Sequence, residues 1–428
     1  MQSAAIIGHK VLNNARGWKP VKKFDPRLKL HQALVSGFPI EVFSNLISKG
    51  QDIEATDHDG QTPLHLAAFL DLKLHVQVLI NNRADLDSKD QKGNTPVHYA
   101  SELNHCECLK LLIDNGASVN LTNIDGRTPL HLAAENRNAK VVGMLLDVEW
   151  VKFDVGDLQE PPVRPFDLAL VNGDWRSVKM FIIRGADVNK KTPFGKPIFV
   201  AIKTGRTEMI KVLLKFKVKL SITDQDGNSP LHLAVTEQVI GIVKFLVNES
   251  SDNINAVNGR GKTALHLAAL LKKTEIVSIL INAGANCLIQ DDSGSTPLHE
   301  ICRCKYPNFL EAMLVMRKLG KGTDFNIVNN FGETPIYIAI RQKNKKLVLL
   351  LRFYYPDMES TLHDTILSGD VEMTSKLLHE SNEESSPSKS NFFNVFFLSF
   401  RSILVQNVLL GTRPWFLANP LKLNPPSR

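Results

Sequence analysis

The heptapeptide Thr62-Pro63-Leu64-His65-Leu66-Ala67-Ala68 decides the fold, because the chain repeats it. A nearly identical copy fills residues 128–134, and weaker copies begin at Thr95, Ser229, Thr263, Thr296 and Thr334. The spacing is 33 residues from Thr62 to Thr95 and 33 again to Thr128. A fixed period of this length predicts a stack of similar units in place of separate globular domains.

Each part of the repeated unit has a structural role. The proline suits the first turn of a helix, where its missing N–H costs nothing, and the preceding Thr can cap that turn. A second apolar stretch follows, as in Val76, Leu79 and Ile80, with the spacing of an amphipathic helix. A glycine in a polar turn stands two residues before each strong copy, at Gly60, Gly93, Gly126, Gly227, Gly261, Gly294 and Gly332.

With these parts in this order, the chain resembles the ankyrin-repeat family. The resemblance implies an all-α fold, an ankyrin-repeat solenoid of stacked helix-turn-helix units with β-hairpin loops. It also implies that the heptapeptide histidines hydrogen-bond to loop backbone and serve structure. These histidines are His65, His98, His131, His232, His266 and His299.

The repeat pattern predicts three regions along the chain. Residues 1–26 form an N-terminal extension, residues 27–380 form the array, and residues 381–428 form a flexible linker and an apolar tail. The array holds about nine repeats and a capping unit at each end. Two repeats are degenerate, with 164–170 and 196–202 in place of the heptapeptide, and enlarged loops are expected at 150–163 and 316–324.

Composition limits the setting of the protein. The net charge of +7 is a mild basic excess over 428 residues, and it permits acidic partners without requiring nucleic acid. The five cysteines form no disulfide framework, and the N-terminus has no secretory core, so we expect a cytoplasmic or, as an alternative, a nuclear protein.

The apolar stretch 391–411 is interrupted by Arg401, which is costly within a membrane span. We favour an unstructured tail over a segment that docks on a partner or a membrane surface, and a transmembrane helix is the least favoured reading.

No pattern in the sequence predicts catalysis. The chain has no phosphate-binding loop, nucleophile elbow or kinase signature, so we expect neither an enzyme nor a bound cofactor. One residue separates Cys106 from Cys108 and Cys302 from Cys304, and structural zinc prefers wider pairs. No metal ligands are therefore predicted. Nucleic-acid binding is disfavoured because aromatic residues do not alternate with the basic ones.

A partner-binding surface is predicted where the residues are not dictated by the fold, just after each heptapeptide. In ankyrin folds these positions border a long concave face. Apolar and basic residues there make our candidates: Phe69, Leu70, Leu270, Leu271, Lys272, Lys273, Arg303, Lys305, Tyr306 and Arg341. The hypothesis is an acidic protein segment held by the later units, with Leu270 and Leu271 as apolar anchors. The alternative is a solvated, variable helix end without a ligand.

Asn189 is a candidate for modification. The segment Asp187-Val188-Asn189 resembles the one that asparaginyl hydroxylases modify in ankyrin repeats, although Phe181 stands where a leucine is usual. The alternative is an asparagine that bonds only to nearby backbone.

Two functions agree with the sequence. The favoured one is a protein–protein adaptor or scaffold that binds partner proteins through the concave face of the array. The alternative is a truncated isoform or fragment of a larger ankyrin-containing signalling protein, of the ubiquitin ligase, kinase or channel type, whose effector domain is absent here. A fold alone does not choose between them.

Overall fold

The computed structural model describes residues 26–249, 253–303, 327–344, 347–348 and 351. The chain divides into two compact units, Met1–Asp292 and Ser293–Arg428, called here the N-terminal and the C-terminal unit. Each unit is described by itself. The predicted boundaries at 26 and 380, the loop at 316–324 and the tail at 381–428 lie wholly or partly outside the described residues.

The N-terminal unit consists of helix pairs, preceded by a 3₁₀ helix, η1 (Pro26–Leu28). The first helices of the pairs are α2 (Lys29–Val35), α4 (Pro63–Phe69), α6 (Pro96–Glu102), α8 (Pro129–Glu135), α10 (Pro165–Val171), α12 (Pro197–Lys203), α14 (Pro230–Thr236) and α16 (Ala264–Leu270). The second helices are α3 (Ile40–Ser48), α5 (Lys73–Asn81), α7 (Cys106–Asp114), α9 (Ala139–Leu146), α11 (Trp175–Ile183), α13 (Thr207–Lys215), α15 (Ile240–Glu249) and α17 (Thr274–Asn282). The C-terminal unit contributes α18 (Pro297–Arg303) and α20 (Pro335–Arg341), which pack on each other.

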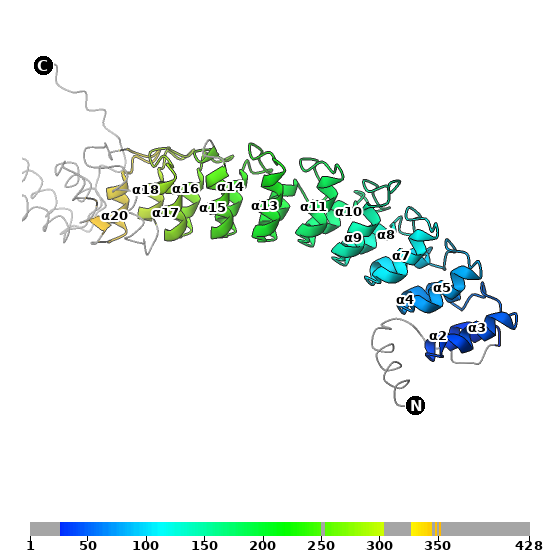
Figure 1. The fold of residues 1–428 in the computed structure, drawn as a ribbon. Helices are drawn as coiled ribbons and strands as arrows, with labels where there is room; N and C mark the ends of the chain where they lie inside the picture. The colour runs from blue at the N-terminus through cyan, green and yellow to red at the C-terminus, as the bar shows by residue number, and fades with distance from the viewer. Residues whose placement is uncertain (1–25, 250–252, 304–326, 345–346, 349–350, 352–428) are drawn as a thin grey trace, which may run out of the picture. The chain divides into compact units, whose positions relative to one another are not determined.

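The pairs of the N-terminal unit stack in chain order and form two layers (Figure 1). Each first helix packs on the first helices before and after it, and the second helices form a parallel layer of their own. Leu64, Ala67 and Ala68 are fully buried between neighbouring helices. Because each pair covers the apolar side of the next, the core runs along the stack.

The Thr and His residues of the heptapeptide hold one unit to the next. The Thr62 backbone N–H donates to His65 Nδ1 at 3.1 Å, so the proton of the neutral ring sits on Nε2. Nε2 then donates to the carbonyl oxygen of Asn94 in the following loop, at 2.9 Å. Equivalent bonds run from His98, His131, His232 and His299 to Arg127, Val163, Lys262 and Glu333. The structural role predicted for these histidines is confirmed.

The loops between pairs are tight turns, most of them closed by an Asp or Asn side chain, and the turn at 192–195 is closed by Thr192. Asp57 Oδ1 accepts hydrogen bonds from the backbone N–H groups of Asp59 and Gln61, both at 2.9 Å. Successive turns are joined by one backbone bond, such as Gln91 N–H to the Asp59 carbonyl oxygen at 3.0 Å. Within the described residues, β pairing is limited to two isolated bridges, Thr192–Gly195 and Val257–Thr263. The loops therefore follow the hairpin path predicted for them with almost no regular strand.

The degenerate repeats interrupt this chain of turns. Backbone hydrogen bonds join each turn to the next from Asp59 to Leu158. They resume between Asp226 and Gly259. Between Leu158 and the turn at 224–228, the described loops share no backbone–backbone hydrogen bond, and side-chain bonds link them instead, such as that from Lys190 to Asp154. At the start of α12, Lys196 and Phe199 replace the Thr and His of most other repeats, and Lys196 Nζ donates to the carbonyl oxygen of Thr223 in the next loop at 3.3 Å.

The first degenerate repeat replaces the Thr–His pair with an ion pair. Arg164 precedes α10, and its guanidinium donates to Asp167 through Nε at 2.9 Å and through Nη2 at 2.8 Å. Its Nη1 reaches Asp154 in the enlarged loop at 2.8 Å. The 150–163 loop that the sequence predicts is thus fixed to the start of α10 by charge.

Candidate protein-binding surface

The predicted partner-binding residues cluster at the turns between first and second helices. Phe69, Leu270, Arg303 and Arg341 each end a first helix, and they therefore occupy equivalent positions in their repeats. Leu70 and Leu271 are the C-cap residues that follow. Lys272 comes next, with a left-handed φ of 57°, and Lys273 caps the start of α17. Lys305 and Tyr306 lie outside the described residues.

The residues at the start of the array are less exposed than the sequence suggests. Phe69 is half-buried and packs edge-to-face on Tyr99 of the next repeat, with ring centroids 5.7 Å apart. The Tyr99 hydroxyl donates to Asp90 at 2.6 Å, which fixes that ring in place. Leu70 is also half-buried. Phe69 thus contributes to contact between repeats as well as to the surface.

The turn after α16 is the more open of the two apolar sites. Leu270 is 38% exposed, and the neighbouring Lys272 is exposed without an anionic partner among the described residues. Leu271 and Lys273 are half-buried. Because α4 and α16 lie near opposite ends of the N-terminal unit (Figure 1), the structure separates Phe69 and Leu70 from this second site.

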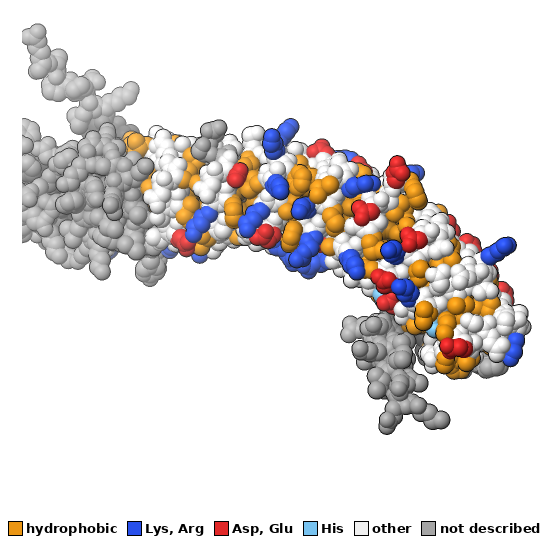
Figure 2. Space-filling view, viewed as in Figure 1, with side chains coloured by type: hydrophobic (Ala, Val, Ile, Leu, Met, Phe, Trp, Pro, Cys, Tyr) orange, Lys and Arg blue, Asp and Glu red, His pale blue; other side chains and the backbone are white. Residues whose placement is uncertain are grey.

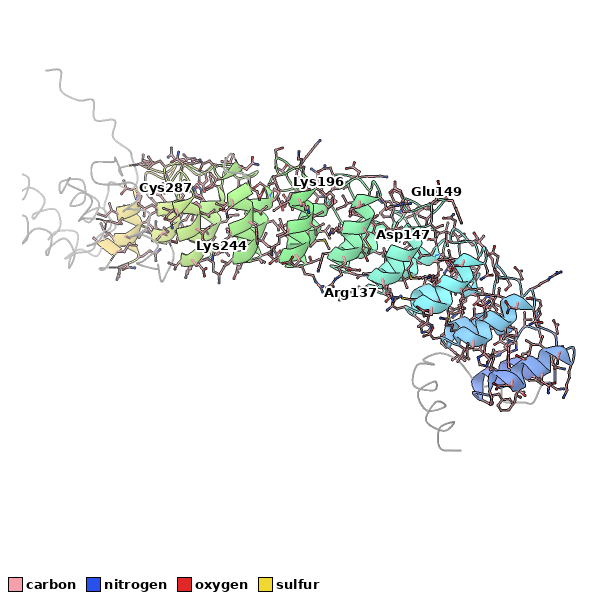
Figure 3. The ribbon with its side chains drawn as sticks, in the orientation of Figure 1. Arg137, Asp147, Glu149, Lys196, Lys244 and Cys287 are labelled. Atoms are coloured by element: carbon pink, nitrogen blue, oxygen red, sulfur yellow. The ribbon has the colours of Figure 1, made fainter. Side chains whose placement is uncertain are left out.

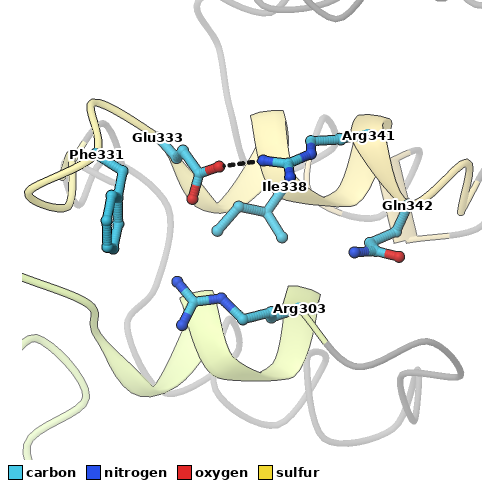
Figure 4. Close-up of a pocket in the computed structure, with 6 residues that line it drawn as sticks. All are labelled: Arg303, Phe331, Glu333, Ile338, Arg341 and Gln342. Carbon is cyan, nitrogen blue, oxygen red and sulfur yellow. Dashed lines mark hydrogen bonds and ion pairs between the residues drawn. The ribbon is translucent and has the colours of Figure 1, made fainter. Parts of the chain in front are cut away.

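In the C-terminal unit, Arg303 and Arg341 line a common pocket of about 400 Å³ (Figure 4). The other lining residues are Phe331, Glu333, Ile338 and Gln342. Arg341 Nη1 donates to Glu333 Oε1 at 2.6 Å. Arg303 lies across the pocket, where Nη1 is 3.5 Å from the buried Glu300 carboxylate. Each guanidinium that the sequence assigns to a partner therefore already has a carboxylate beside it.

Phe331 is a surface residue that sequence reasoning missed. It is 72% exposed at the rim of this pocket, immediately before the loop glycine Gly332. Most other repeats carry a charged or polar residue at this position, for example Asp59, Lys92 and Asp226, and Phe194 before Gly195 is a second aromatic residue there. An aromatic residue at a position that is usually polar was the signal available in the sequence.

Asn189 has a structural partner. Its side-chain Oδ1 accepts a hydrogen bond from the backbone N–H of Lys219 in the next loop, at 2.8 Å. Asn120 and Asn255 do the same for Lys152 and Asn286, also at 2.8 Å. The asparagine at this position therefore links neighbouring loops, and modification of Asn189 stays a hypothesis.

The groups that resemble chemical sites serve structure where the structure describes them. Cys108 is buried with its Sγ 3.3 Å from Asp71, and burial raises the pKa of this thiol. Asp57, His58 and Asp59 are close enough to hold a cation, but Asp57 closes its own turn through the backbone bonds given above. Neither cluster defines a reaction.

The comparisons with known proteins assign the family. A family model described as "Ankyrin repeats (3 copies)" matches residues 30–123, 75–157, 166–258 and 239–320. These ranges cover more than half of the chain, so the chain belongs to the ankyrin-repeat family. The all-α ankyrin solenoid predicted from the heptapeptide is confirmed. Ankyrin repeats are in general an interaction fold without catalytic activity.

The curated relatives are similar to this chain over part of their length. The chain is 31% identical over 131 residues to the B-cell lymphoma 3 protein homolog of Mus musculus, covering 30% of this chain and 29% of that protein. It is 31% identical over 161 residues to neurogenic locus notch homolog protein 1 of Homo sapiens, covering 37% of this chain and 6% of that protein. The Danio rerio protein of the same name is 37% identical over 160 residues, with the same coverage. The chain thus matches less than a third of each relative.

Among the described residues, no helix has the length and apolar character needed to cross a membrane. The 391–411 tail lies outside them.

Proposed function

We propose that this chain is a protein–protein adaptor or scaffold, without catalysis of its own, that binds partners through the face bordered by the ends of its first helices. In ankyrin folds this face is the concave one. A cytoplasmic or nuclear setting and a partner with an acidic segment belong to the same proposal.

The contrast between two sets of residues supports it. The heptapeptide residues are buried and bonded to one another, as in His65 and Leu64. The residues that end the first helices differ from repeat to repeat and are mostly open to solvent; they are Phe69, Glu102, Glu135, Val171, Lys203, Thr236, Leu270, Arg303 and Arg341. Since the fold does not need a particular side chain there, these positions are free to be specific for a ligand.

The single observation that carries most weight is Leu270. This leucine is 38% exposed and lies beside the exposed Lys272, and apolar and basic side chains exposed together support a protein interface at this turn. Lys272 supports an acidic ligand there, whereas Arg303 and Arg341 are already paired. Leu270 and Lys272 are therefore the centre of the proposed site.

The test is capture of partners by the full chain, with two double variants compared. Leu270→Asp with Lys272→Glu changes the proposed site. Thr236→Asp with Gln238→Glu changes the same two positions one repeat earlier and serves as the control, since Gln238 shares the left-handed backbone of Lys272. Reversal of Arg303 is avoided because it would place a second carboxylate against buried Glu300.

A protein captured by the wild-type chain, identified by mass spectrometry and then purified, should bind the control variant normally and the Leu270 variant weakly. Equal binding to both variants would refute the proposed surface. The alternative, a part of a longer signalling protein, is tested separately by whether a transcript continues the coding sequence after residue 380 into an effector domain.

A further inference from the structure

The positive charge of this chain is concentrated in its degenerate repeats. Residues 171–220 contain twelve Lys and Arg residues and three Asp and Glu residues, an excess of nine positive charges. The whole chain has a net charge of +7, so the rest of it is slightly acidic. Of the three acids, Asp174 caps α11 and Asp187 accepts the Asn189 backbone N–H, whereas Glu208 pairs with Lys211.

Five of the cations in and beside this segment form a strip on the exposed side of the second helices. This basic strip is Arg176 and Lys179 on α11, Lys211 and Lys215 on α13, and Lys244 on α15, all exposed. The opposite sides of the same helices are buried, as at Val178 and Leu213. Since α13 packs against both α11 and α15, the strip is continuous across three helices.

Figure 2 shows Lys and Arg side chains, with some Asp and Glu among them, over the middle of the N-terminal unit, and Figure 3 labels Lys244 on α15. Lys179, Lys211 and Lys244 occupy the same position in three successive second helices, the fifth residue of each. They therefore form a row that crosses the helix axes.

The charges of the strip are open to a ligand. Arg176, Lys179 and Lys215 have no anionic partner among the described residues. Lys211 pairs with Glu208 at 2.6 Å and Lys244 with Glu275 at 3.3 Å, but all four of these side chains are about half exposed. Exposed pairs of this kind contribute little, so a ligand carboxylate can replace them at small cost.

We propose that the basic strip on α11, α13 and α15 is a second binding surface, which takes an acidic protein segment in extended conformation. Neighbouring packed helices lie about 8–10 Å apart, and a chain in the extended polyproline II conformation advances about 3.1 Å per residue with three residues per turn, so every third side chain lies on one side of it. An acidic residue at every third position would therefore meet Lys179, Lys211 and Lys244 in turn. This surface lies on the other helix layer from Leu270 and is independent of the proposed function above.

A polypeptide fits the strip better than a single-stranded nucleic acid does. Bases bind sequence-independently by stacking on free aromatic rings. The two rings beside the strip are half-buried and already covered by cations, with Arg176 4.7 Å from the Trp175 ring centroid and Lys211 5.3 Å from that of Phe245. The strip thus offers charge without stacking surfaces.

The probe is a fluorescein-labelled peptide of about 12 residues, long enough in the polyproline II conformation to cross three helices. It carries Glu at every third position and uncharged residues between, and fluorescence anisotropy measures its binding to the full chain. Lys179→Glu with Lys215→Glu should weaken binding about tenfold, since each reversal turns an attraction into a repulsion. The control is Lys110→Glu with Lys140→Glu, two exposed lysines on α7 and α9 that give the same change in net charge.

The control and the Leu270→Asp, Lys272→Glu variant should bind the peptide as the wild type does, and circular dichroism should show unchanged helix content in all variants. Equal weakening by the control would mean a general charge effect and would overturn the proposal. A single-stranded RNA of equal charge that displaces the peptide and binds more tightly would also overturn it, in favour of nucleic acid.

Discussion

At the residue scale, the stack depends on histidines that are kept neutral. Burial lowers the pKa of His65, His131, His232 and His299, and it lowers that of His98 to about 4. Each ring accepts one backbone N–H at Nδ1 and donates Nε2–H to the next repeat, which a neutral imidazole can do and an imidazolium cannot.

We expect stability to fall in mild acid for this reason. The folded state binds fewer protons than the unfolded state, in which these histidines titrate near 6.5. Their contribution is complete above that pH and is lost as the pH falls from about 6.5 towards 4. Urea unfolding followed by circular dichroism should show a midpoint that decreases from pH 7 to pH 5, whereas a constant midpoint would contradict the role given to these rings.

The ion pair at the start of α10 gives a second prediction. Asp167→Asn should cost about 3 kcal/mol of unfolding free energy, because Arg164 is left nearly buried with only Asp154 as an anionic partner. Arg164→Thr with Asp167→His restores the residue types of the other repeats and should recover most of that loss. If the double variant were as unstable as the single one, the ion pair would not be a substitute for the Thr–His pair.

At the element scale, the turns depend on glycine for two separable reasons. Gly227 and Gly116 both have left-handed φ values, +75° and +92°. A Cβ at Gly227 would lie 2.5 Å from the Gly259 backbone nitrogen in the next turn, whereas one at Gly116 would meet nothing within 4 Å.

Alanine at these two glycines should therefore have unequal effects. Gly116→Ala should cost about 1–2 kcal/mol, from the backbone conformation alone. Gly227→Ala should cost about 1–3 kcal/mol more, since neighbouring turns must move apart. Urea unfolding of both variants measures the difference. Equal losses would show that the turns do not pack as closely as described.

The elements were predictable from the sequence because the same residues recur with one purpose. Thr62, Pro63 and His65 specify a capped first helix wherever they appear, and Gly60 marks the turn before it. The binding surface was less predictable, since its residues recur in no pattern. Exposure at Leu270 agrees with the prediction. The contact of Phe69 with Tyr99 joins residues of different repeats, and Arg303 pairs with Glu300 one helical turn before it. Phe331 escaped notice because it lies in a turn and not after a heptapeptide.

At the scale of the whole molecule, stability in a stacked protein is the sum of each repeat and its contacts with its neighbours. The backbone bonds between turns are missing from Leu158 to the turn at 224–228, and α12 has neither a Thr–His pair nor an ion pair like that of α10. We therefore expect the repeats between residues 165 and 220 to make the weakest contacts with their neighbours in the N-terminal unit.

Hydrogen exchange should show this directly. Amides of α10 to α13 should exchange faster than those of α4 to α9, because local opening needs fewer bonds to break there. Mass spectrometry of peptides from the two regions gives the comparison within one sample. Uniform protection across the N-terminal unit would contradict a weak centre.

The missing bonds between turns also bear on how the array responds to force. If partners hold the N-terminal unit by residues on either side of the gap, tension along the stack is opposed there by helix contacts and by side-chain bonds such as that of Asn189 to Lys219. Elsewhere a backbone hydrogen bond between turns and a histidine hydrogen bond between repeats must break as well. The unit would then lengthen first at residues 165–220, where the repeats separate at lower force, while the repeats on both sides stay folded.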